Sequence, residues 1–476
     1  MQLVKSITPK RIKTLHCLSL TFLVLFLSAV QPAFSQDNSP YSRFGIGDLV
    51  PGTHIINRGM GGIAAGQAGA SSINFSNPAS YSSFQAVLES KSKKLVSGRA
   101  ILDVGLNFEN RTLSEPSTNK AKFTASNALF SYIQVGMPLK NNWGLSFGLR
   151  PISRISYNIV RNERLVDPNT GLPIDSSTTT YRGDGGAYLA SVGTGFSLFA
   201  KTDSKGRDIE KLSVGINAGY FFGSKDYSTR RSLINDTVLY YQANYETKTN
   251  FGSLYFDAGA QYMKVMKSGI ILTLGAFGNI GQKISATQDI LRETYLFDDN
   301  LGNIRLDSVS DKKNFKGKIN MPASFTIGFT TRKIADPAKD KGGWMLGVDF
   351  TQQNWSRYRF YGQTDSVRNS WLLKVGAELN PVPKRNYFSN VAYRFGFFMG
   401  PDYIKVKENL PVLGGSFGLG LPVRLSRQAP NQVTQINMAF EYGKRGNNDN
   451  LLKENSFRFS LAFSLSDMWF IKRKYD

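Results

Sequence analysis

The chain has 476 residues and a formal net charge of +23, with 33 Phe, 21 Tyr and 45 Gly. One cysteine and two histidines are too few for a disulfide framework or a multi-histidine metal site. No stretch after the N-terminus approaches the roughly eighteen apolar residues of a membrane-spanning helix, which leaves strands as the elements that could span a membrane.

The N-terminal residues 1–35 have the pattern of a secretory signal peptide. A basic start is followed by an apolar core from Leu18 to Val30 and by the small-x-small cleavage site Ala33-Phe34-Ser35. The apolar core is too short to span a bilayer stably. Cys17, the only cysteine, lies in this segment, so the exported chain would carry no thiol.

Residues 36–97 differ from the rest of the chain because they are rich in turns and small residues. Examples are Arg58-Gly59-Met60-Gly61-Gly62 and Asn77-Pro78-Ala79. Few long alternating strands fit here, and small residues permit close backbone packing. We predict that residues 36–97 form an N-terminal plug, or hatch. His54, the only histidine after the signal peptide, is expected to be a polar residue of that plug.

From residue 98 to residue 476, segments that alternate apolar and polar residues recur down the chain. In 457–465 every odd position is large and apolar and every even position is small or polar, which gives a strand with one apolar face and one polar face. The candidate strands are 98–112, 126–139, 142–160, 186–201, 209–228, 248–266, 269–290, 319–333, 342–360, 369–380, 387–404, 414–427, 432–446 and 454–472. They predict an all-β fold, a 14-stranded antiparallel transmembrane β-barrel over residues 98–476.

The connections between these strands alternate between short and long. Lys140-Asn141 and Lys267-Ser268 are tight turns, whereas 161–185, 229–247 and 291–318 are long, polar and expected to be loops. Short turns on one side and longer loops on the other are typical of barrels in the outer membrane of Gram-negative bacteria. An even number of strands places both termini on the short-turn side, which is the periplasmic side.

Because successive side chains of a strand point to opposite faces, its alternation pattern assigns each charged residue to one side of the wall. A Lys or Arg on the lipid face near the midplane would cost about 2–4 kcal/mol, so ionisable strand residues should face the lumen. The residues expected there are Asp257, Asp349, Lys374, Glu378, Arg394, Glu441 and Arg458. Their mixed signs favour paired side chains that brace a crowded lumen over a pore for ions of one sign.

The remaining motifs do not indicate catalysis. The glycine-rich stretch 414–420 resembles a phosphate-binding loop only superficially, because it lacks the following Lys-Ser/Thr and the strand–helix context. No helix-turn-helix, zinc or RNA-binding signature accompanies the positive charge. We assign that charge to solvated surface and to contacts with anionic headgroups of outer-membrane lipid and lipopolysaccharide. We expect no enzyme activity, no metal, no cofactor and no nucleic-acid partner.

Pro151 interrupts the candidate strand 142–160. Proline cannot donate a hydrogen bond to the ladder, and a closed barrel offers no free edge for it. Two interpretations stay open. Pro151 lies just outside the paired part of its strand, or it marks a kink that opens the wall sideways into the bilayer.

Several segments resemble the FadL-type long-chain fatty acid transporter family, whose members are fourteen-stranded barrels with an N-terminal hatch. The most specific likeness is the glycine-rich run with the later Asn-Pro-Ala, both in the predicted plug. The weaker ones are 145–151, 321–329 and 348–358, which resemble barrel strands. The Lys/Arg-rich ending 469–476 departs from the family's usual terminal aromatic and is similar to barrels of the Bacteroidetes lineage.

The resemblance implies a passive, plug-gated channel for hydrophobic compounds such as long-chain fatty acids, with Pro151 as a candidate lateral opening. The hatch and gating residues would be Arg58, Gly59, Met60, Gly61, Gly62, Asn77, Pro78 and Ala79. The alternative is a non-transporting barrel that docks other envelope proteins, as an accessory or shuttle subunit of a secretion or outer-membrane assembly system. In that case the segments 161–185 and 291–318 would serve as adaptors.

Overall fold

The computed structural model describes residues 39–88, 95–116, 122–204, 207–234, 240–298, 302–423 and 432–469. The predicted signal peptide, residues 1–35, and the ending after Trp469 lie outside the described residues. Within the described residues, no helix is long and apolar enough to cross a membrane.

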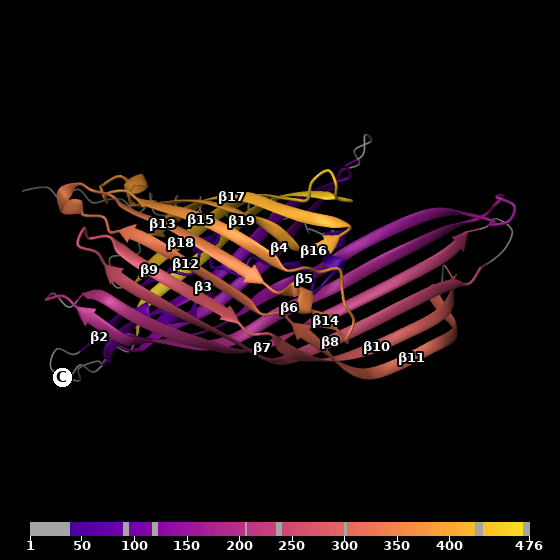
Figure 1. The fold of residues 1–476 in the computed structure, drawn as a ribbon, viewed down its shortest axis with the longest axis horizontal. Coiled ribbons are helices and arrows are strands. Elements are labelled where there is room, and N and C mark those ends of the chain that lie inside the picture. Colours follow the sequence, from indigo (N-terminus) through magenta and orange to yellow (C-terminus); the bar gives the residue numbers. More distant parts are fainter. Residues whose placement is uncertain are drawn as a thin grey trace, which may run out of the picture.

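The strands join into one sheet that closes on itself as a barrel (Figure 1). Closure is made by β19 (Lys453–Trp469) and β3 (Leu95–Ser114), whose antiparallel pairing runs from Lys453↔Ser114 to Trp469↔Gly98. Between them lie β4 (Lys122–Lys140), β5 (Trp143–Val166), β6 (Pro173–Thr202), β7 (Asp208–Ile234), β8 (Gln242–Val265), β9 (Ile271–Asn279), β10 (Gln282–Asp298), β11 (Gly302–Met321), β12 (Ser324–Lys333), β13 (Gly343–Gln353), β14 (Arg359–Phe360), β15 (Ser370–Asn380), β16 (Ala392–Val406), β17 (Glu408–Val423) and β18 (Val433–Arg445).

Two wall strands are each divided into two elements. β9 and β10 form one wall strand interrupted at residues 280–281, and β11 and β12 form the next one, interrupted at 322–323. β9 pairs with β12 and β10 pairs with β11, so the two interruptions lie side by side. Pro322 has no backbone N–H to give to the ladder, which explains the second break. Counted in this way the wall has 14 antiparallel strands, and the predicted fold class is confirmed.

The wall is apolar on the outside and polar on the inside. Along β19, Phe457, Phe463 and Leu465 are between 40 and 48% exposed, whereas Ser460 and Ala462 are fully buried. A water-soluble protein would bury the large apolar side chains and expose the serine. A closed barrel that faces hydrocarbon shows the reverse arrangement, and this protein is accordingly an outer-membrane β-barrel.

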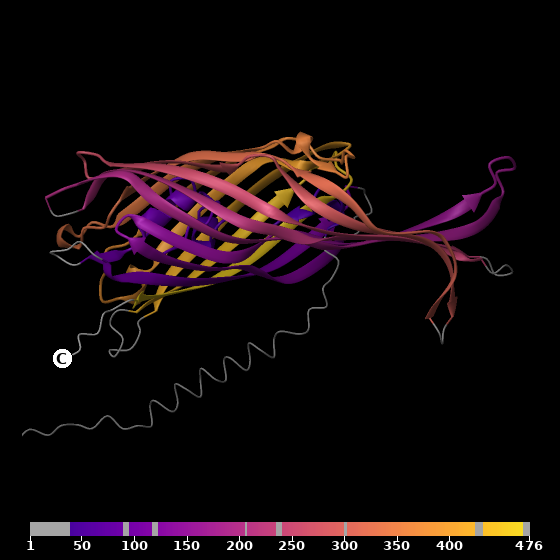
Figure 2. The ribbon, with the colours of Figure 1, turned by 90° about the horizontal axis from the view of Figure 1, so that it is seen from below.

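Six neighbouring strands continue past the rest of the barrel as a projecting sheet, at the right of Figures 1 and 2. In order across the sheet they are β5, β6, β7, β8, β10 and β11. The prediction of loops over 161–185, 229–247 and 291–318 is wrong, because most of these residues are paired strand: for example, Arg164 pairs with Ser176 and Ser176 with Ile234.

The missed strands are polar on both faces. Residues 176–181 of β6 read Ser-Ser-Thr-Thr-Thr-Tyr, which favours strand by propensity but has no apolar–polar alternation to reveal it. At the tip of the β5–β6 hairpin, Asp167 accepts the backbone N–H of Asn169 at 2.8 Å, which lowers the pKa of the Asp167 carboxyl.

Residues 39–88, the N-terminal segment, form short elements rather than a wall strand. These are η1 (Pro40–Arg43), β1 (Asp48–Leu49), α2 (Ile55–Arg58), η2 (Pro78–Ser83) and β2 (Ala86–Leu88). Ser39, His54 and Asn77 cap η1, α2 and η2, because each side chain accepts the backbone N–H two residues further on. β1 pairs with β5, and β2 pairs with β3.

Candidate functional site

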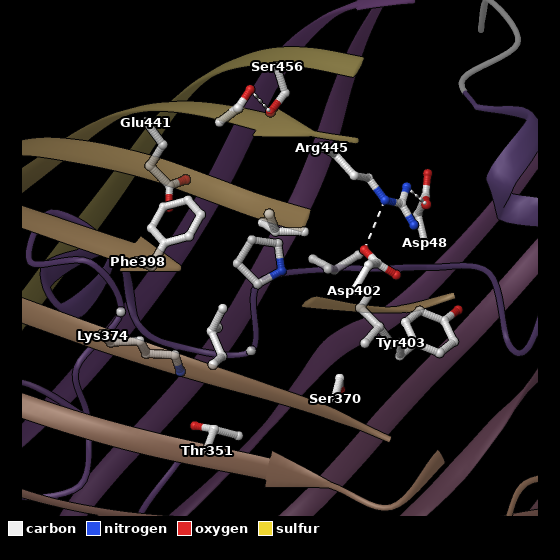
Figure 3. Close-up of a pocket in the computed structure, with 18 of the residues that line it drawn as sticks. Asp48, Thr351, Ser370, Lys374, Phe398, Asp402, Tyr403, Glu441, Arg445 and Ser456 are labelled. Atoms are coloured by element: carbon white, nitrogen blue, oxygen red, sulfur yellow. Dashed lines mark hydrogen bonds and ion pairs between the residues drawn. The ribbon is translucent and has the colours of Figure 1, made fainter. Parts of the chain in front are cut away.

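A charged cleft lies between the N-terminal segment and the wall (Figure 3). Its volume is about 360 Å³. One side is residues 48–53 of the N-terminal segment, and the other sides come from β3, β13 and β15–β19. Figure 3 shows Arg445 reaching from β18 toward Asp48 on one side and Asp402 on the other.

The outer part of the cleft is held by two arginines that share carboxylates. Arg445 Nη1 lies 2.8 Å from Asp48 Oδ1, and Arg445 Nε lies 2.8 Å from Asp402 Oδ2. Arg111 Nη1 lies 2.7 Å from Asp48 Oδ2. Both arginines also reach Glu454, at 3.1 Å from Arg111 and 3.2 Å from Arg445. Asp48 thereby ties β1 to β3 and β18, on the side of the barrel where β19 closes the sheet.

The inner part of the cleft continues the same network. Arg58 of α2 pairs with Glu441 of β18 and donates to Asn107 Oδ1 at 2.5 Å. Arg458 bridges Glu441 at 3.4 Å and Glu109 at 3.3 Å. Glu109 in turn lies 2.8 Å from Arg111, which joins the two parts. We call these residues the cleft cluster: Asp48, Arg58, Glu109, Arg111, Asp402, Glu441, Arg445, Glu454 and Arg458.

The cleft cluster is nearly neutral. Its five carboxylates face four guanidinium groups, and the ammonium group of Lys374 also lines the cleft. Rings of one sign of charge select ions in a pore, and this cluster does not form one. Removing one partner of a buried ion pair costs about 3–5 kcal/mol because it leaves an uncompensated charge. The arrangement is therefore suited to holding the N-terminal segment against the wall.

The other charged residues singled out from the sequence lie at separate points of the wall. Asp349 on β13 accepts the backbone N–H groups of Ala64 at 2.6 Å and Ala65 at 2.9 Å. Lys374 stands opposite Asp349 in the β13–β15 register. Glu378 and Arg394 form an ion pair of 2.6 Å between β15 and β16.

Asp257 is apart from both groups, on β8. Its Oδ1 accepts a hydrogen bond of 2.6 Å from Asn217 Nδ2 on the neighbouring strand β7. The structure thus brings Lys374, Glu441 and Arg458 to the cleft, whereas Asp257, Asp349, Glu378 and Arg394 lie elsewhere on the wall.

The glycine-rich run of the N-terminal segment passes close to the wall. Met60 is fully buried, and Gly61 donates its N–H to Ser416 Oγ at 2.9 Å. Gly61 has φ +68°, a left-handed conformation that favours glycine. Gly59 lies against Gly418 of β17, and Gly62 lies near Lys374.

Asn77-Pro78-Ala79 forms the second close approach. Asn77 caps η2 and also donates its Nδ2 to the carbonyl of Ala65 at 2.8 Å, which joins two parts of the N-terminal segment. Ala79 is fully buried, and the backbone of Pro78 lies against Gly195 and Gly215 of the wall.

Rows of wall glycines make these approaches possible. Gly144, Gly195, Gly215 and Gly259 are register neighbours on β5, β6, β7 and β8, and a Cβ at any of them would strike residues 77–84. The second row is Gly347, Gly376 and Gly396 on β13, β15 and β16, where a Cβ would strike residues 60–63. We call them the glycine rows. Sequence reasoning missed them, because an isolated glycine in a strand does not say which backbone approaches it.

His54 caps α2 and does not line the cleft. It is 1% exposed, its Nδ1 accepts the N–H of Ile56, and its Nε2 contacts Asp103 of β3. Tyr132 Oη lies near the same carboxylate and the backbone N–H of Ile55. Among the described residues there is no group of three or more His, Cys, Asp or Glu side chains placed to hold a metal ion.

The wall is interrupted next to Pro151. β4 and β5 pair only from Lys140↔Trp143 to Ile133↔Leu149, although both strands continue beyond this point. After Leu149, β5 pairs with β1 instead of β4, through Leu49↔Ser153 and Asp48↔Arg154. Pro151 stands at a register shift in the β5–β6 ladder. We call this the β4–β5 seam.

An apolar groove of about 610 Å³ lies on the outer face beside the β4–β5 seam. Ala190 and Ala218 are small residues within it, and Phe147, Tyr220 and Leu254 are larger and exposed. Ile133 and Leu149, the last pair of the β4–β5 ladder, also line the groove.

Comparison with protein families gives a single assignment. The BamG family model matches residues 12–476 of the chain. The chain belongs to the BamG family. The matching family model is thus BamG and not a FadL-type model, and its match covers the wall, the cleft and the projecting sheet alike. No curated protein sequence matches the chain.

Solved structures similar to the chain include a Pseudomonas aeruginosa FadL homologue, with 13% identity, a TM-score of 0.49, and coverage of 89% of this chain and 100% of that one. The P. putida toluene transporter TodX has 12% identity, a TM-score of 0.47, and coverage of 86% and 97%. The CymD monoaromatic hydrocarbon channel has 13% identity, a TM-score of 0.47, and coverage of 88% and 98%. The closed barrel is established by the strand pairing within this chain itself.

Proposed function

We propose that this member of the BamG family is a docking barrel, an accessory or shuttle subunit of a secretion or outer-membrane assembly system. The observation that carries the proposal is the cleft cluster, which joins the N-terminal segment to the wall through buried, nearly balanced charges. A hydrophobic compound passing here would have to separate these pairs, at about 3–5 kcal/mol for each partner left unpaired. Family membership supports the same interpretation.

In this proposal the N-terminal segment is a permanent plug. The glycine rows accept its backbone at residues 60–63 and 77–84, and the cleft cluster fixes Asp48 and Arg58. Residues 1–35 act as the export signal, and both termini lie in the periplasm with the short turns. The projecting sheet then extends from the cell surface, away from the termini.

The projecting sheet would be the docking part. Among the described residues, the edge of β5 that faces away from β6 has no backbone partner beyond Ser156. The edge of β11 that faces away from β10 contacts β14 at residues 319–320 and Tyr361 at Phe315 and Lys318, and it has no ladder partner before Phe315. A free strand edge presents unpaired N–H and C=O groups that can accept an extended strand of another protein. Both edges of the projecting sheet meet this requirement.

The test removes the projecting sheet and leaves the barrel. Residues 159–181, 229–245 and 292–310 are replaced by Asn-Gly turns, which join the register partners Asn158↔Arg182, Ser228↔Glu246 and Leu291↔Asp311. After crosslinking in native membranes, the full chain should purify with a stoichiometric envelope protein, and the shortened variant should not. A full chain that purifies alone with bound fatty acid would contradict the proposal.

A second candidate function is passive transport of hydrophobic compounds. It is favoured by one observation, the β4–β5 seam with the apolar groove beside it. Burial of each CH₂ group contributes about 0.8 kcal/mol, so the affinity for a ligand would rise with acyl length. The measurement is uptake of a fluorescent fatty acid into reconstituted vesicles. Uptake that exceeds that of protein-free vesicles and changes when residues 36–60 are deleted would favour transport over docking.

A further inference from the structure

The short-turn end of the barrel repeats one surface pattern. Four turns present an exposed cation within three residues of an exposed apolar side chain: Leu139 with Lys140, Met266 with Lys267, Lys333 with Ile334, and Arg385 with Phe388. The apolar members are large: Ile334 is 69% exposed and Phe388 67% exposed. These turns follow β4, β8, β12 and β15, so they are distributed around the barrel rather than gathered on one side.

The cations of this pattern lack acidic partners. Within the described residues, Lys267, Lys333 and Arg385 form no ion pair, and Lys140 lies 5.3 Å over the ring of Trp143. Lys341, a further exposed cation in the same turn as Lys333, forms no ion pair among these residues either. Other cations at this end are paired: Lys201 with Glu210 at 3.2 Å, Arg207 with Asp203 at 2.7 Å and Lys384 with Asp340 at 3.1 Å. We call Lys140, Lys267, Lys333, Lys341 and Arg385 the turn rim.

The opposite end of the molecule is electrically balanced. Residues 157–183, 226–249 and 289–316, which span the projecting sheet, contain eleven Lys or Arg and twelve Asp or Glu. Arg161 pairs with Glu163 there, Lys248 with Glu246, and Arg305 with Glu293. The excess positive charge of the chain therefore does not come from the projecting sheet.

A cation next to an apolar side chain at the end of an apolar wall suits the boundary between hydrocarbon and headgroups. The apolar side chain remains in the acyl region, and the long Lys or Arg side chain extends to the phosphate level. Unpaired cations in that position attract anionic lipids. A ring of such positions fits a lipid leaflet, which surrounds the barrel, better than an acidic protein, which would contact one side.

We infer that the turn rim binds the phosphate groups of anionic phospholipids in the leaflet at the short-turn end. This inference does not depend on docking by the projecting sheet. It requires that the barrel, taken from a mixed bilayer, retains phosphatidylglycerol in preference to phosphatidylcholine, and that the preference weakens with salt.

The test uses the full signal-cleaved chain in nanodiscs of equal parts phosphatidylglycerol and phosphatidylcholine. Lipid that stays bound after transfer to detergent is counted by native mass spectrometry. We expect at least a tenfold preference for phosphatidylglycerol at low salt. The variant Lys140→Gln, Lys267→Gln, Lys333→Gln, Lys341→Gln, Arg385→Gln should lose most of it.

The matched control removes five cations from the projecting sheet: Arg164→Gln, Arg230→Gln, Arg231→Gln, Lys248→Gln and Lys312→Gln. It should keep the lipid preference. Equal retention of the two lipids by the unmodified protein would overturn the inference, and so would a rim variant that keeps the preference but loses a co-purifying acidic protein. If the rim variant does not fold, the salt titration of the unmodified protein decides, since a preference unchanged between 50 and 500 mM salt would also overturn it.

Discussion

The N-terminal segment and the projecting sheet are stabilised in different ways, and only the first contributes to the hydrophobic clusters of the interior. The N-terminal segment has little regular structure, and it is held by glycine rows that receive its backbone and by buried charge pairs with the wall. The projecting sheet is regular, but its ion pairs are exposed; Arg161, for example, is 66% exposed. The comparison teaches that tertiary contacts hold the first region, whereas ladder hydrogen bonds between neighbouring strands hold the second.

The largest difference should appear when one charge is removed from each region. Arg58→Ala leaves Glu441 buried with only Arg458 beside it, and we expect a loss of about 3–5 kcal/mol in the free energy of unfolding. Unfolding by urea in lipid vesicles measures it. In the projecting sheet, Arg161→Ala removes an exposed pair and should change the same quantity by about 0–1 kcal/mol. Equal losses in the free energy of unfolding for the two variants would show that the two regions are not stabilised differently.

The glycine rows permit a sharper test with a matched control. In Gly396→Ala the new Cβ would strike the backbone of Gly61, so the N-terminal segment must shift, at about 1–3 kcal/mol. In Gly415→Ala, on the partner strand, the nearest atom is 3.7 Å away. Limited proteolysis of the N-terminal segment should accelerate in the first variant and remain unchanged in the second. A protected N-terminal segment in Gly396→Ala would show that the glycine rows do not matter.

A smaller and more local loss of stability is expected when a cap within the N-terminal segment is removed. Asn77→Ala removes the cap of η2 and the hydrogen bond to the carbonyl of Ala65, for a loss of about 1 kcal/mol. Because neither contact involves the projecting sheet, amide hydrogen exchange should rise only in residues near η2. Exchange that rises in the projecting sheet as well would mean that the two regions are coupled.

The barrel could be predicted from the sequence because hydrocarbon imposes alternation on the wall. In β19, Phe457 to Leu465 carries it plainly. The projecting sheet could not be predicted, because water on both faces imposes no such pattern on residues such as Thr178 and Thr180. Propensity alone would have favoured strand there, but a polar run between two strands also resembles a loop.

The cleft could be predicted only in part. The alternation of side chains along a strand places Glu441 and Arg458 on the inner side of the wall, but it does not identify their ion-pair partners. No sequence pattern indicated that Asp48, Arg111 and Arg445 belong to the cleft cluster. Their carboxylates and guanidinium groups come from β1, β3 and β18, which are far apart in the chain. The short β1 is itself defined only by its pairing with β5.

The most direct test of the central claim is the ion conductance of the purified chain in a planar bilayer. If the N-terminal segment is the plug that we propose, the unmodified protein should show no steady conductance, and Arg58→Ala combined with Gly396→Ala should produce open-channel events. A steady conductance of the unmodified protein, unchanged in the double variant, would contradict the account.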